Sequence, residues 1–236
     1  MDFVWFGWSC LFLVFWGVVY ASLRIENRRE MREMSGWTAL LAFTEPVFVP
    51  TYWNPPSLFD LAQRTGFDIE SFIFCFSIGG LAVALYEKVF PVIHEPIPGA
   101  QSGLRRWIPV LVVLTAPAVF AVLDITLQFN PIYSAFIALT GAGVVMLALR
   151  PDLFHKMVLS GLLFLAVYFV YFLTLLLAAP GYVEQVWNIH ALSGITVGGI
   201  PLEELLFAAS FGFCWSGIYE FVFRRRIKRL DKASSF

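Results

Sequence analysis

Two adjacent carboxylates, Glu203 and Glu204, follow Pro201 at the start of a long apolar run near the C-terminus. One interpretation is helix capping, because proline suits the first turn of a helix and acidic side chains there complement the helix dipole. Apolar residues flank the pair on both sides, however, and ionisable groups inside membranes commonly mark a functional site. Burial disfavours the charged form of a carboxyl group. We therefore expect one member of the pair to stay protonated and to act as a proton donor.

Three further acidic residues are candidates for the same chemistry. Glu70 lies at the start of another apolar run, and Glu45 and Asp124 lie within apolar segments near the same predicted helix ends. For Glu45 and Asp124, hydrogen bonding to backbone groups freed by a proline or a turn is an equal alternative to catalysis. Glu87 and Glu220 lie beside basic residues at the opposite helix ends and are interpreted as interfacial ion pairs.

No pattern typical of a metal or cofactor site accompanies these residues. The three cysteines fall in apolar runs, which favours buried free thiols over a disulfide or metal ligands. His190 is a candidate ligand or proton relay, although a single loop histidine often has neither role. A phosphate loop, a dinucleotide fingerprint and a zinc cluster are all missing from the sequence, and the net charge of −1 does not indicate a nucleic acid partner. We expect no metal, no cofactor and no nucleic acid.

The composition indicates an integral membrane protein. Of the 236 residues, 59% are hydrophobic and 14% are charged, whereas about a quarter of the residues of a soluble domain are charged. The first apolar run lacks the basic region and the cleavage site of a signal peptide, so we expect a permanent helix there. Six apolar segments approach the ~20 residues needed to cross a bilayer; they cover residues 3–23, 67–90, 107–127, 131–149, 157–179 and 201–223.

A seventh segment, Met34 to Trp53, is ambiguous because it contains Glu45 and prolines. If this segment crosses the membrane, fifteen of the sixteen Lys and Arg residues lie on one side, with only Arg64 on the other. Cytoplasmic loops carry such an excess of basic residues. We therefore predict seven helices, with the N-terminus outside and the C-terminus in the cytoplasm, in the plasma membrane of a prokaryote.

Two parts of the chain resemble one another. A proline and a Trp-Asn pair recur at a constant spacing of 134 residues: Pro46, Trp53 and Asn54 match Pro180, Trp187 and Asn188. Seven residues between positions 74 and 90 recur at a spacing of 133 residues, which makes Glu70 the counterpart of Glu203. Each repeat supplies three helices, and one linking helix between them makes the repeats parallel, so we expect a shared site at their interface.

The predicted fold class is therefore an all-α integral membrane protein, a seven-helix bundle built from two parallel three-helix repeats plus one linking helix. The predicted parts are a first repeat over residues 1–93, a linker and linking helix over 94–130, a second repeat over 131–223 and a basic cytoplasmic tail over 224–236. Trp53, Asn54, Trp187 and Asn188 are either ordinary interfacial residues or residues that shape the site. Their repetition favours the second role, and with His190 and Pro201 they are our candidate substrate-binding residues.

The segments TEPVFVPTYWNPPSLFDL and VWNIHALSGITVGGIPLEELLF resemble the small membrane-embedded lycopene cyclases. That family occurs as two-subunit enzymes in some bacteria, as fused chains in others, and joined to phytoene synthase in fungi. Its hallmark, Pro-x-Glu followed by Glu or Asp, is found here as Pro201-Leu202-Glu203-Glu204. The resemblance spans both repeats, although the first repeat, Phe67-Asp68-Ile69-Glu70-Ser71, lacks the proline and the second acid of the hallmark.

The resemblance implies an intramolecular lyase or isomerase that closes β-ionone rings on lycopene, or on a related linear carotenoid, without a cofactor. Such a redox-neutral ring closure needs an acid, a base, a dry cavity and groups that stabilise a carbocation. Clustered carboxylates can supply the acid and the base, and aromatic faces attract cations. Our hypothesis is then that Glu203 or Glu204 is the proton donor and that Glu70 is its partner in acid–base work or cation stabilisation, with Glu45 and Asp124 in support.

Other functions stay open at this point. A hydratase or an ε-type cyclase would use the same protonation with another outcome. A polyene-binding protein and a proton-coupled transporter are alternatives of other classes. A retinal-type Schiff base has no lysine available in segment 201–223. Whether the chain forms a homo-oligomer is also left open by the sequence.

Overall fold

The computed structural model describes residues 3–99 and 106–229. It is mostly helical, and six helices in the described residues are long and apolar enough to cross a membrane. Together with their short extensions these six are α1 (Val4–Ser22), α5 (Ile69–Val89), α6 (Ile108–Ala121) with the π-helical turn η4 (Val122–Thr126), α7 (Pro131–Leu149), α8 (Phe154–Ala178) after the 3-10 turn η5 (Pro151–Leu153), and α10 (Leu202–Val222). The six predicted apolar spans are confirmed as helices to within a few residues at each end.

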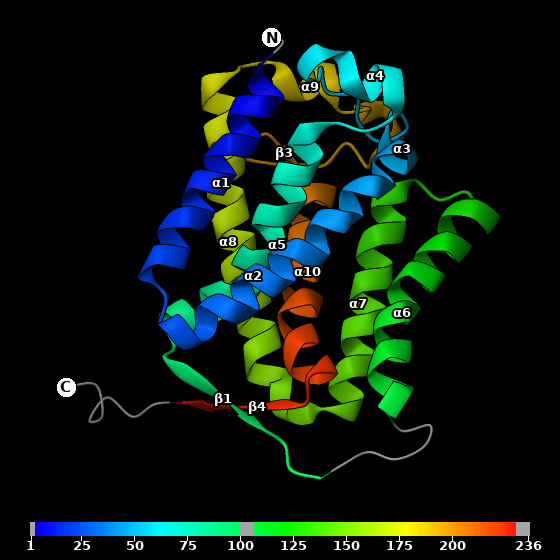
Figure 1. Ribbon diagram of the computed structural model, residues 1–236. Helices are drawn as coiled ribbons and strands as arrows, with labels where there is room; N and C mark the ends of the chain where they lie inside the picture. The colour runs from blue at the N-terminus through cyan, green and yellow to red at the C-terminus, as the bar shows by residue number, and fades with distance from the viewer. Residues whose placement is uncertain (1–2, 100–105, 230–236) are drawn as a thin grey trace.

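The ambiguous segment is helical only as far as Phe48, and its helix begins earlier than predicted. It consists of α2 (Ile25–Ala39), the 3-10 turn η1 (Leu40–Thr44) and α3 (Glu45–Phe48). Figure 1 shows these three elements rising obliquely across α5, from the end of the bundle where α1 finishes to the end where α4 (Leu61–Thr65) lies. The first half of α2 is rich in charged residues, so hydropathy alone does not mark it as a span. The seventh crossing therefore stays a prediction.

Local sequence explains where several helices begin. The Asp68 side chain caps α5 by accepting a hydrogen bond from the backbone N–H of Ser71. Asn130 caps α7 in the same way, accepting from the N–H of Ile132, and Pro131 follows as the first helical residue. These are the residue types preferred at helix N-termini.

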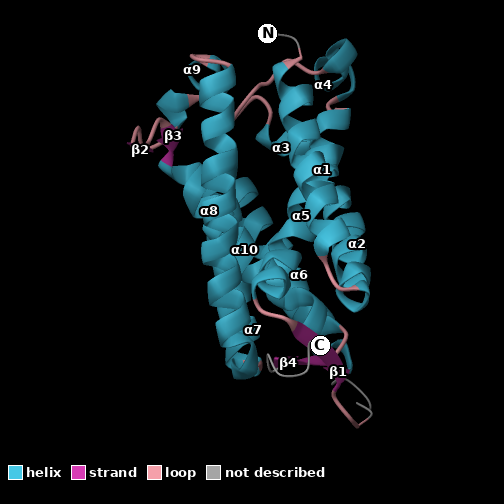
Figure 2. Ribbon diagram, turned by 90° about the vertical axis from the view of Figure 1, so that its left-hand side faces the viewer, coloured by secondary structure: helices cyan, strands magenta, loops and turns pink. Residues whose placement is uncertain are grey.

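Two small antiparallel sheets, which the all-α prediction did not include, lie at opposite ends of the bundle (Figure 2). Strands β1 (Val92–Pro96) and β4 (Arg225–Arg229) pair at one end, which we call the strand end. The pairing takes up the first part of the predicted basic tail; residues 230–236 lie outside the described residues. At the other end, which we call the α4 end, β2 (Thr196–Val197) and β3 (Ile200–Pro201) form a hairpin.

The hairpin has a direct sequence cause. Its two-residue turn is Gly198-Gly199, and both glycines have positive φ. Such a turn needs residues without a Cβ and matches the natural twist of paired strands. The hairpin leads directly into α10 and so sets where the helix carrying Glu203 and Glu204 begins. Short elements complete the α4 end: the 3-10 turns η2 (Leu58–Asp60) and η6 (Ile189–Ala191), and α9 (Tyr182–Val186).

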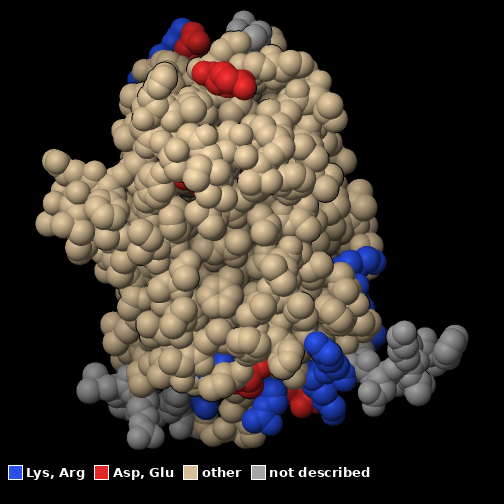
Figure 3. Space-filling model, turned by 180° about the vertical axis from the view of Figure 1, so that it is seen from behind, with Lys and Arg blue, Asp and Glu red and all other residues tan. Residues whose placement is uncertain are grey.

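The helices pack as two similar groups. Helix α5 packs against α1 and α2, and α10 packs against α7 and α8; α5 and α10 also contact each other, while α6 packs mainly on α7. A wide band of the surface in Figure 3 is almost free of charged residues, and Lys and Arg gather at the strand end. This distribution suits a protein surrounded by lipid between two aqueous ends.

Candidate active site

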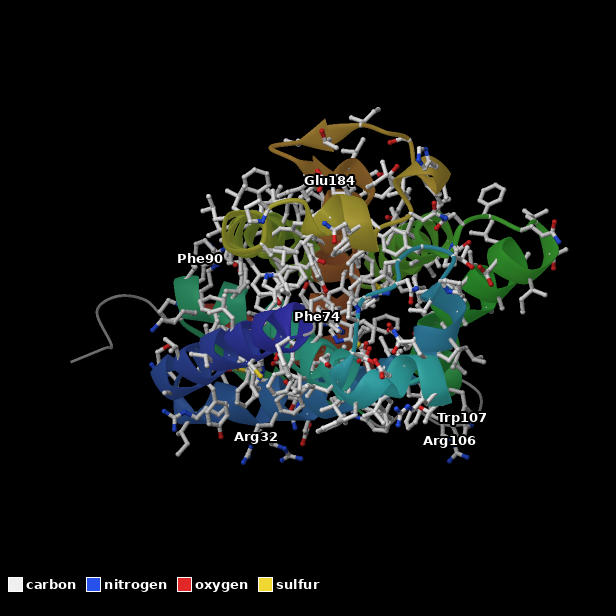
Figure 4. All side chains as sticks on the ribbon, turned by 90° about the horizontal axis from the view of Figure 1, so that it is seen from above. Arg32, Phe74, Phe90, Arg106, Trp107 and Glu184 are labelled. Atoms are coloured by element: carbon white, nitrogen blue, oxygen red, sulfur yellow. The ribbon has the colours of Figure 1, made fainter. Side chains whose placement is uncertain are left out.

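A cavity of about 370 Å³ lies inside the bundle between α3, α5, α6, α7 and α10. Its wall is mostly apolar, and within the described residues the carboxyl groups that line it are those of Glu45 and Glu204. Figure 4 shows Phe74, one of the lining residues, in the middle of the bundle, whereas Arg32, Arg106 and Glu184 lie at the periphery. Twelve lining residues are aromatic: Trp5, Trp8, Phe48, Tyr52, Trp53, Phe74, Phe120, Tyr168, Trp187, Phe207, Phe211 and Trp215.

Glu204 lies in the first turn of α10 and is 4% exposed. Its Oε2 accepts a hydrogen bond from the hydroxyl of Tyr168 at 2.6 Å, and its Oε1 accepts from the indole N–H of Trp187 at 2.7 Å. The hydroxyl of Tyr52 also donates to Oε1. Only an ionised carboxyl group can accept from all three donors without offering a proton itself. These contacts can stabilise a carboxylate at Glu204, a form suited to accept a proton or to stabilise a cation.

Glu45, the first residue of α3, has a different environment. It is 7% exposed, and its Oε1 atom has no hydrogen-bond partner among the described residues. No lysine or arginine in the described part of the chain forms an ion pair with it. Burying a charged carboxylate without a partner costs several kcal/mol or more, so the neutral acid is favoured. Glu45 thus has the surroundings of a proton donor, and it faces the same cavity as Glu204.

Glu203 is buried but does not line the cavity. Neighbouring residues of an α-helix point in directions about 100° apart, so only one member of the pair can face inward. The Oε1 atom of Glu203 instead accepts hydrogen bonds from the Tyr133 hydroxyl at 2.6 Å and from the Ser193 N–H at 2.8 Å. These bonds fasten the loop before the hairpin to α7 and α10.

Glu70 occupies the corresponding place on α5 and has a corresponding contact. Its Oε1 accepts from the backbone N–H of Leu58 at 2.8 Å, which ties η2 to the first turn of α5. Like Glu203, it is buried and lies outside the cavity lining. Asp124, in the π-helical turn after α6, is half-buried, does not line the cavity and has no hydrogen bond or ion pair to the described residues. The structure therefore brings together Glu204 and Glu45 but not the other three predicted carboxylates.

The repeated Trp-Asn pairs meet across the α4 end of the cavity. Trp53 and Trp187 form an antiparallel backbone bridge, their ring centroids lie 5.4 Å apart, and both line the cavity. The two asparagines lie just outside it: the Asn54 N–H donates to the Val186 carbonyl at 2.8 Å, and the Asn188 N–H donates to the Tyr52 carbonyl at 2.9 Å. These bonds join the two loops that carry the tryptophans.

The remaining candidates do not line the cavity. Pro201 is buried in β3 immediately before α10, and His190 is exposed in η6. Two residues that sequence reasoning missed are Tyr52 and Tyr168, both of which line the cavity and donate to Glu204. A signal for Tyr168 was present, because a phenol hydroxyl in the middle of an apolar helix needs a hydrogen-bond partner. Tyr52 directly precedes the repeated Trp-Asn pair.

Outside the spans, Asp68 belongs to the same acidic region. It caps α5, is 3% exposed and is buried near Glu45. Burial raises the pKa of Asp68, and the hydrogen bonds from Ser71 oppose that rise. Burial and the charges of Glu70 and Asp68 likewise raise the pKa of Tyr182 in α9. Burial therefore disfavours a negative charge on these two side chains.

A second buried cluster lies toward the strand end. The ammonium of Lys156 is within 3.3 Å of Glu30, Glu87 and Glu220, at 3.0, 3.3 and 2.5 Å. The His94 ring lies 3.0 Å from both Glu30 and Glu87. Burial opposes protonation of His94, but hydrogen bonds to Glu30 and Glu87 outweigh it and raise the pKa of His94 to about 10. Ion pairing of Glu87 and Glu220 is confirmed, with Lys156 and His94 as partners. Their predicted interfacial position is wrong, because packing of the helices buries both side chains.

Comparison with known proteins gives one match. Residues 130–222 match the family model described as lycopene cyclase. No curated protein and no solved structure matches the chain. The matched segment runs from α7 to α10 and contains Glu204 with two of its three hydrogen-bond donors, Tyr168 and Trp187. The third donor, Tyr52, lies outside the matched segment. This segment of the chain is therefore similar to the lycopene cyclase family.

Proposed function

We propose that the chain is a lycopene β-cyclase, which converts the linear end groups of lycopene into β-ionone rings by way of a carbocation. The family match supports a carotenoid cyclase. The observation that carries the finer proposal is that two buried carboxyl groups with opposite surroundings face one aromatic cavity. Glu204 has three hydrogen-bond donors, and Oε1 of Glu45 has no described partner.

The reaction assigns different roles to these two groups. The Glu45 carboxylic acid donates its proton to C2 of the terminal C1=C2 double bond, and the positive charge forms at C1. The C5=C6 double bond attacks C1, which closes the ring and moves the charge to C5. Glu204 then removes the proton from C6, so that the C5=C6 double bond forms again. The substrate gains and loses one proton, and one proton must return to Glu45 before the next turnover.

This assignment differs from the expectation that Glu203 or Glu204 donates the proton. Three donors hold Glu204 as a base, and Glu203 is engaged by Tyr133 and Ser193 outside the cavity. Glu70 and Asp124 then support the structure rather than the chemistry. Enzymes that work at neutral pH commonly pair an acid and a base whose surroundings favour opposite protonation states.

The aromatic wall suits the intermediate. Trp5 meets Trp53 edge to face with ring centroids 4.7 Å apart, and Phe74 lies 5.4 Å from Trp5. Aromatic faces attract a cation, more strongly when water is excluded. Exclusion of water also protects the carbocation from capture as an alcohol, which would be the hydratase outcome.

We further propose the predicted membrane arrangement, with seven crossings, the N-terminus outside and two parallel repeats. Three structural observations support the repeat. The helix groups α1, α2, α5 and α7, α8, α10 pack alike. The counterparts Glu70 and Glu203 each bind a loop N–H. Gly79 of α5 packs so closely on α2, and Gly212 of α10 on α8, that a Cβ at either glycine would overlap the neighbouring helix. The lipid bilayer and a linear carotenoid are the proposed partners.

Pigment analysis of a lycopene-producing host that expresses the chain tests this function. We expect β-ring carotenoids from the wild type and at least a hundredfold less from Glu45→Gln and Glu204→Gln, the range typical of lost acid–base catalysis. Glu203→Gln is the matched control, and we expect it to retain more activity than either. An ε ring or a hydrated end group would contradict the β-cyclase proposal. Wild-type yields from a folded Glu204→Gln protein would contradict the role of Glu204.

A further inference from the structure

Most residues of the cavity wall are buried or half-buried. Of its lining residues only Leu41, Thr44, Leu114 and Pro117 are exposed. Leu41 and Thr44 belong to η1, and Leu114 and Pro117 belong to α6. The exposed residues therefore lie on two elements only, and they mark one mouth of the cavity between η1 and α6.

On the α6 side, this mouth lies on a helix that is long and apolar enough to cross a membrane. Leu114 and Pro117 lie in the middle of α6, the least buried of the six spans. The surface beside the mouth is apolar, with Trp37, Leu40, Phe43 and Leu111 all more than half exposed. Figure 1 shows α6 at the edge of the bundle, where α7 is its main neighbour.

Both walls of the mouth are interrupted helices. Pro117 lies inside α6 and cannot donate the backbone hydrogen bond of a regular helix. η1 is a 3-10 segment between α2 and α3, and such segments within longer helices often mark points where a helix can adjust. Behind the mouth, the rings of Phe48 and Phe120 meet with centroids 5.9 Å apart.

The size of the cavity indicates what passes through the mouth. A volume of about 370 Å³ lies at the low end of the range of about 300–1,000 Å³ for small-molecule pockets. A C40 polyene is a stiff conjugated rod that cannot fold into a compact space. One end group can reach Glu45 and Glu204 only if the rest of the rod leaves the cavity.

We propose that the linear carotenoid enters sideways from the bilayer between η1 and α6, and that during ring closure its unreacted length stays in this mouth and in the lipid. This inference rests on the proposed cyclase function. It names the route to the site and the residues that set its width. It also means that the carotenoid must enter the cavity separately for each ring closure, because its second end group is outside the protein while the first reacts.

Bulky substitutions at the rim test the route. Leu114→Trp on α6 and Thr44→Trp on η1 narrow the mouth from opposite sides, and we expect each to slow ring formation at least tenfold in lycopene-loaded liposomes. Leu111→Trp is the matched control, because Leu111 lies on the same helix, is 60% exposed and does not line the cavity. We expect it to stay within twofold of the wild type.

A photocrosslinking residue distinguishes a blocked route from a damaged fold. With benzoylphenylalanine at position 114, we expect an adduct with the mass of the carotenoid, and at position 111 an adduct with lipid. Three results would each overturn the route and leave the cyclase function intact. They are lipid adducts alone at position 114, wild-type rates for both tryptophan variants, and a Leu111→Trp protein that is slowed as much as the rim variants. A wild-type protein that forms no ring at all would overturn the proposed function, and the route with it.

Discussion

The two buried acidic sites of this molecule have opposite ways of holding their carboxylates. Toward the α4 end, Glu204 is held by two tyrosines and one tryptophan, all neutral donors. Toward the strand end, Glu30, Glu87 and Glu220 share one lysine and one histidine. Both sites join elements of the two halves of the chain.

The difference shows how partners decide the use of a buried acid. Two cations, Lys156 and His94, offset most of the charge of the three strand-end carboxylates and hold them in an ion-pair cluster, which fastens α2, α5 and β1 to α8 and α10. Neutral donors fix the orientation of Glu204 but leave its negative charge uncompensated beside the cavity. A carboxylate of the second kind can still attract a carbocation or accept a proton. We infer that one site stabilises the fold and the other performs the chemistry.

Removing the lysine should have the largest effect. Lys156→Met leaves three buried carboxylates with only His94 to neutralise them, and breaking a buried ion pair from one side costs about 3–5 kcal/mol. We expect a large fall in the unfolding temperature and in the yield of folded protein in detergent. Lys228→Met is the control, because its pair with Glu95 is exposed and such pairs contribute about 0–1 kcal/mol. Equal stability of the two variants would contradict the comparison.

The histidine should make stability depend on pH. The pKa of His94 rises from its usual value of 6.5 to about 10 in the folded protein. A raised pKa means that the folded state binds this proton more tightly, so the contribution to stability is complete below pH 6.5 and is lost as the pH rises toward 10. Unfolding measured between pH 6 and pH 10 should show this loss in the wild type and a flatter profile in His94→Gln. Parallel profiles would show that His94 is not a charged member of the cluster.

Removing a neutral donor should affect activity more than stability. Tyr168→Phe deletes one hydrogen bond to Glu204, and a bond to a charged group is worth about 1.5–3 kcal/mol, or roughly tenfold to a hundredfold in rate. Tyr171→Phe is a matched control on the same helix, because its hydroxyl donates to the Trp8 carbonyl. Cyclisation rates of the folded variants check this expectation. If Tyr168→Phe cyclises as fast as Tyr171→Phe, the hydrogen bond from Tyr168 to Glu204 does not contribute to the rate.

The smallest effect should come from the loops above the cavity. The Asn188 side chain donates to the Thr51 carbonyl at 3.2 Å in an exposed position, and a neutral bond of this kind contributes about 0.5–1.5 kcal/mol. Asn188→Ala should lower the unfolding temperature slightly and leave ring formation within a few-fold of the wild type. A loss of activity as large as that of Tyr168→Phe would instead assign Asn188 a direct contact with the substrate.

The sequence was sufficient for the apolar helices and for the region of the site. Long apolar runs predicted six spans, which are helices in the structure. The repeated Trp-Asn pairs were predicted to shape the site, and Trp53 and Trp187 do line the cavity, joined by a backbone bridge that the sequence did not predict. The start of α2 was missed because Arg28, Arg29 and Arg32 mask it in a hydropathy profile. Local composition also placed Lys156 at a basic flank, whereas tertiary packing buries its side chain.

The details of the site depended on information that sequence spacing does not contain. Which of Glu203 and Glu204 faces the cavity follows from the rotation of α10 about its axis, and that is set by packing on α7 and α8. The partners of Glu204 come from positions 52, 168 and 187, which only the fold brings together. The proposed role of Glu45 rests on a missing partner among the described residues rather than on any motif.

Infrared spectroscopy tests the central claim most directly, because the C=O stretch of a protonated carboxylic acid is distinct from the bands of a carboxylate. Spectra of the wild type, Glu45→Gln and Glu204→Gln at neutral pH would show which group carries the proton. We predict that a carboxylic acid band of the wild type is lost in Glu45→Gln and retained in Glu204→Gln. Loss of that band in Glu204→Gln, with no change in Glu45→Gln, would contradict the assignment of acid and base.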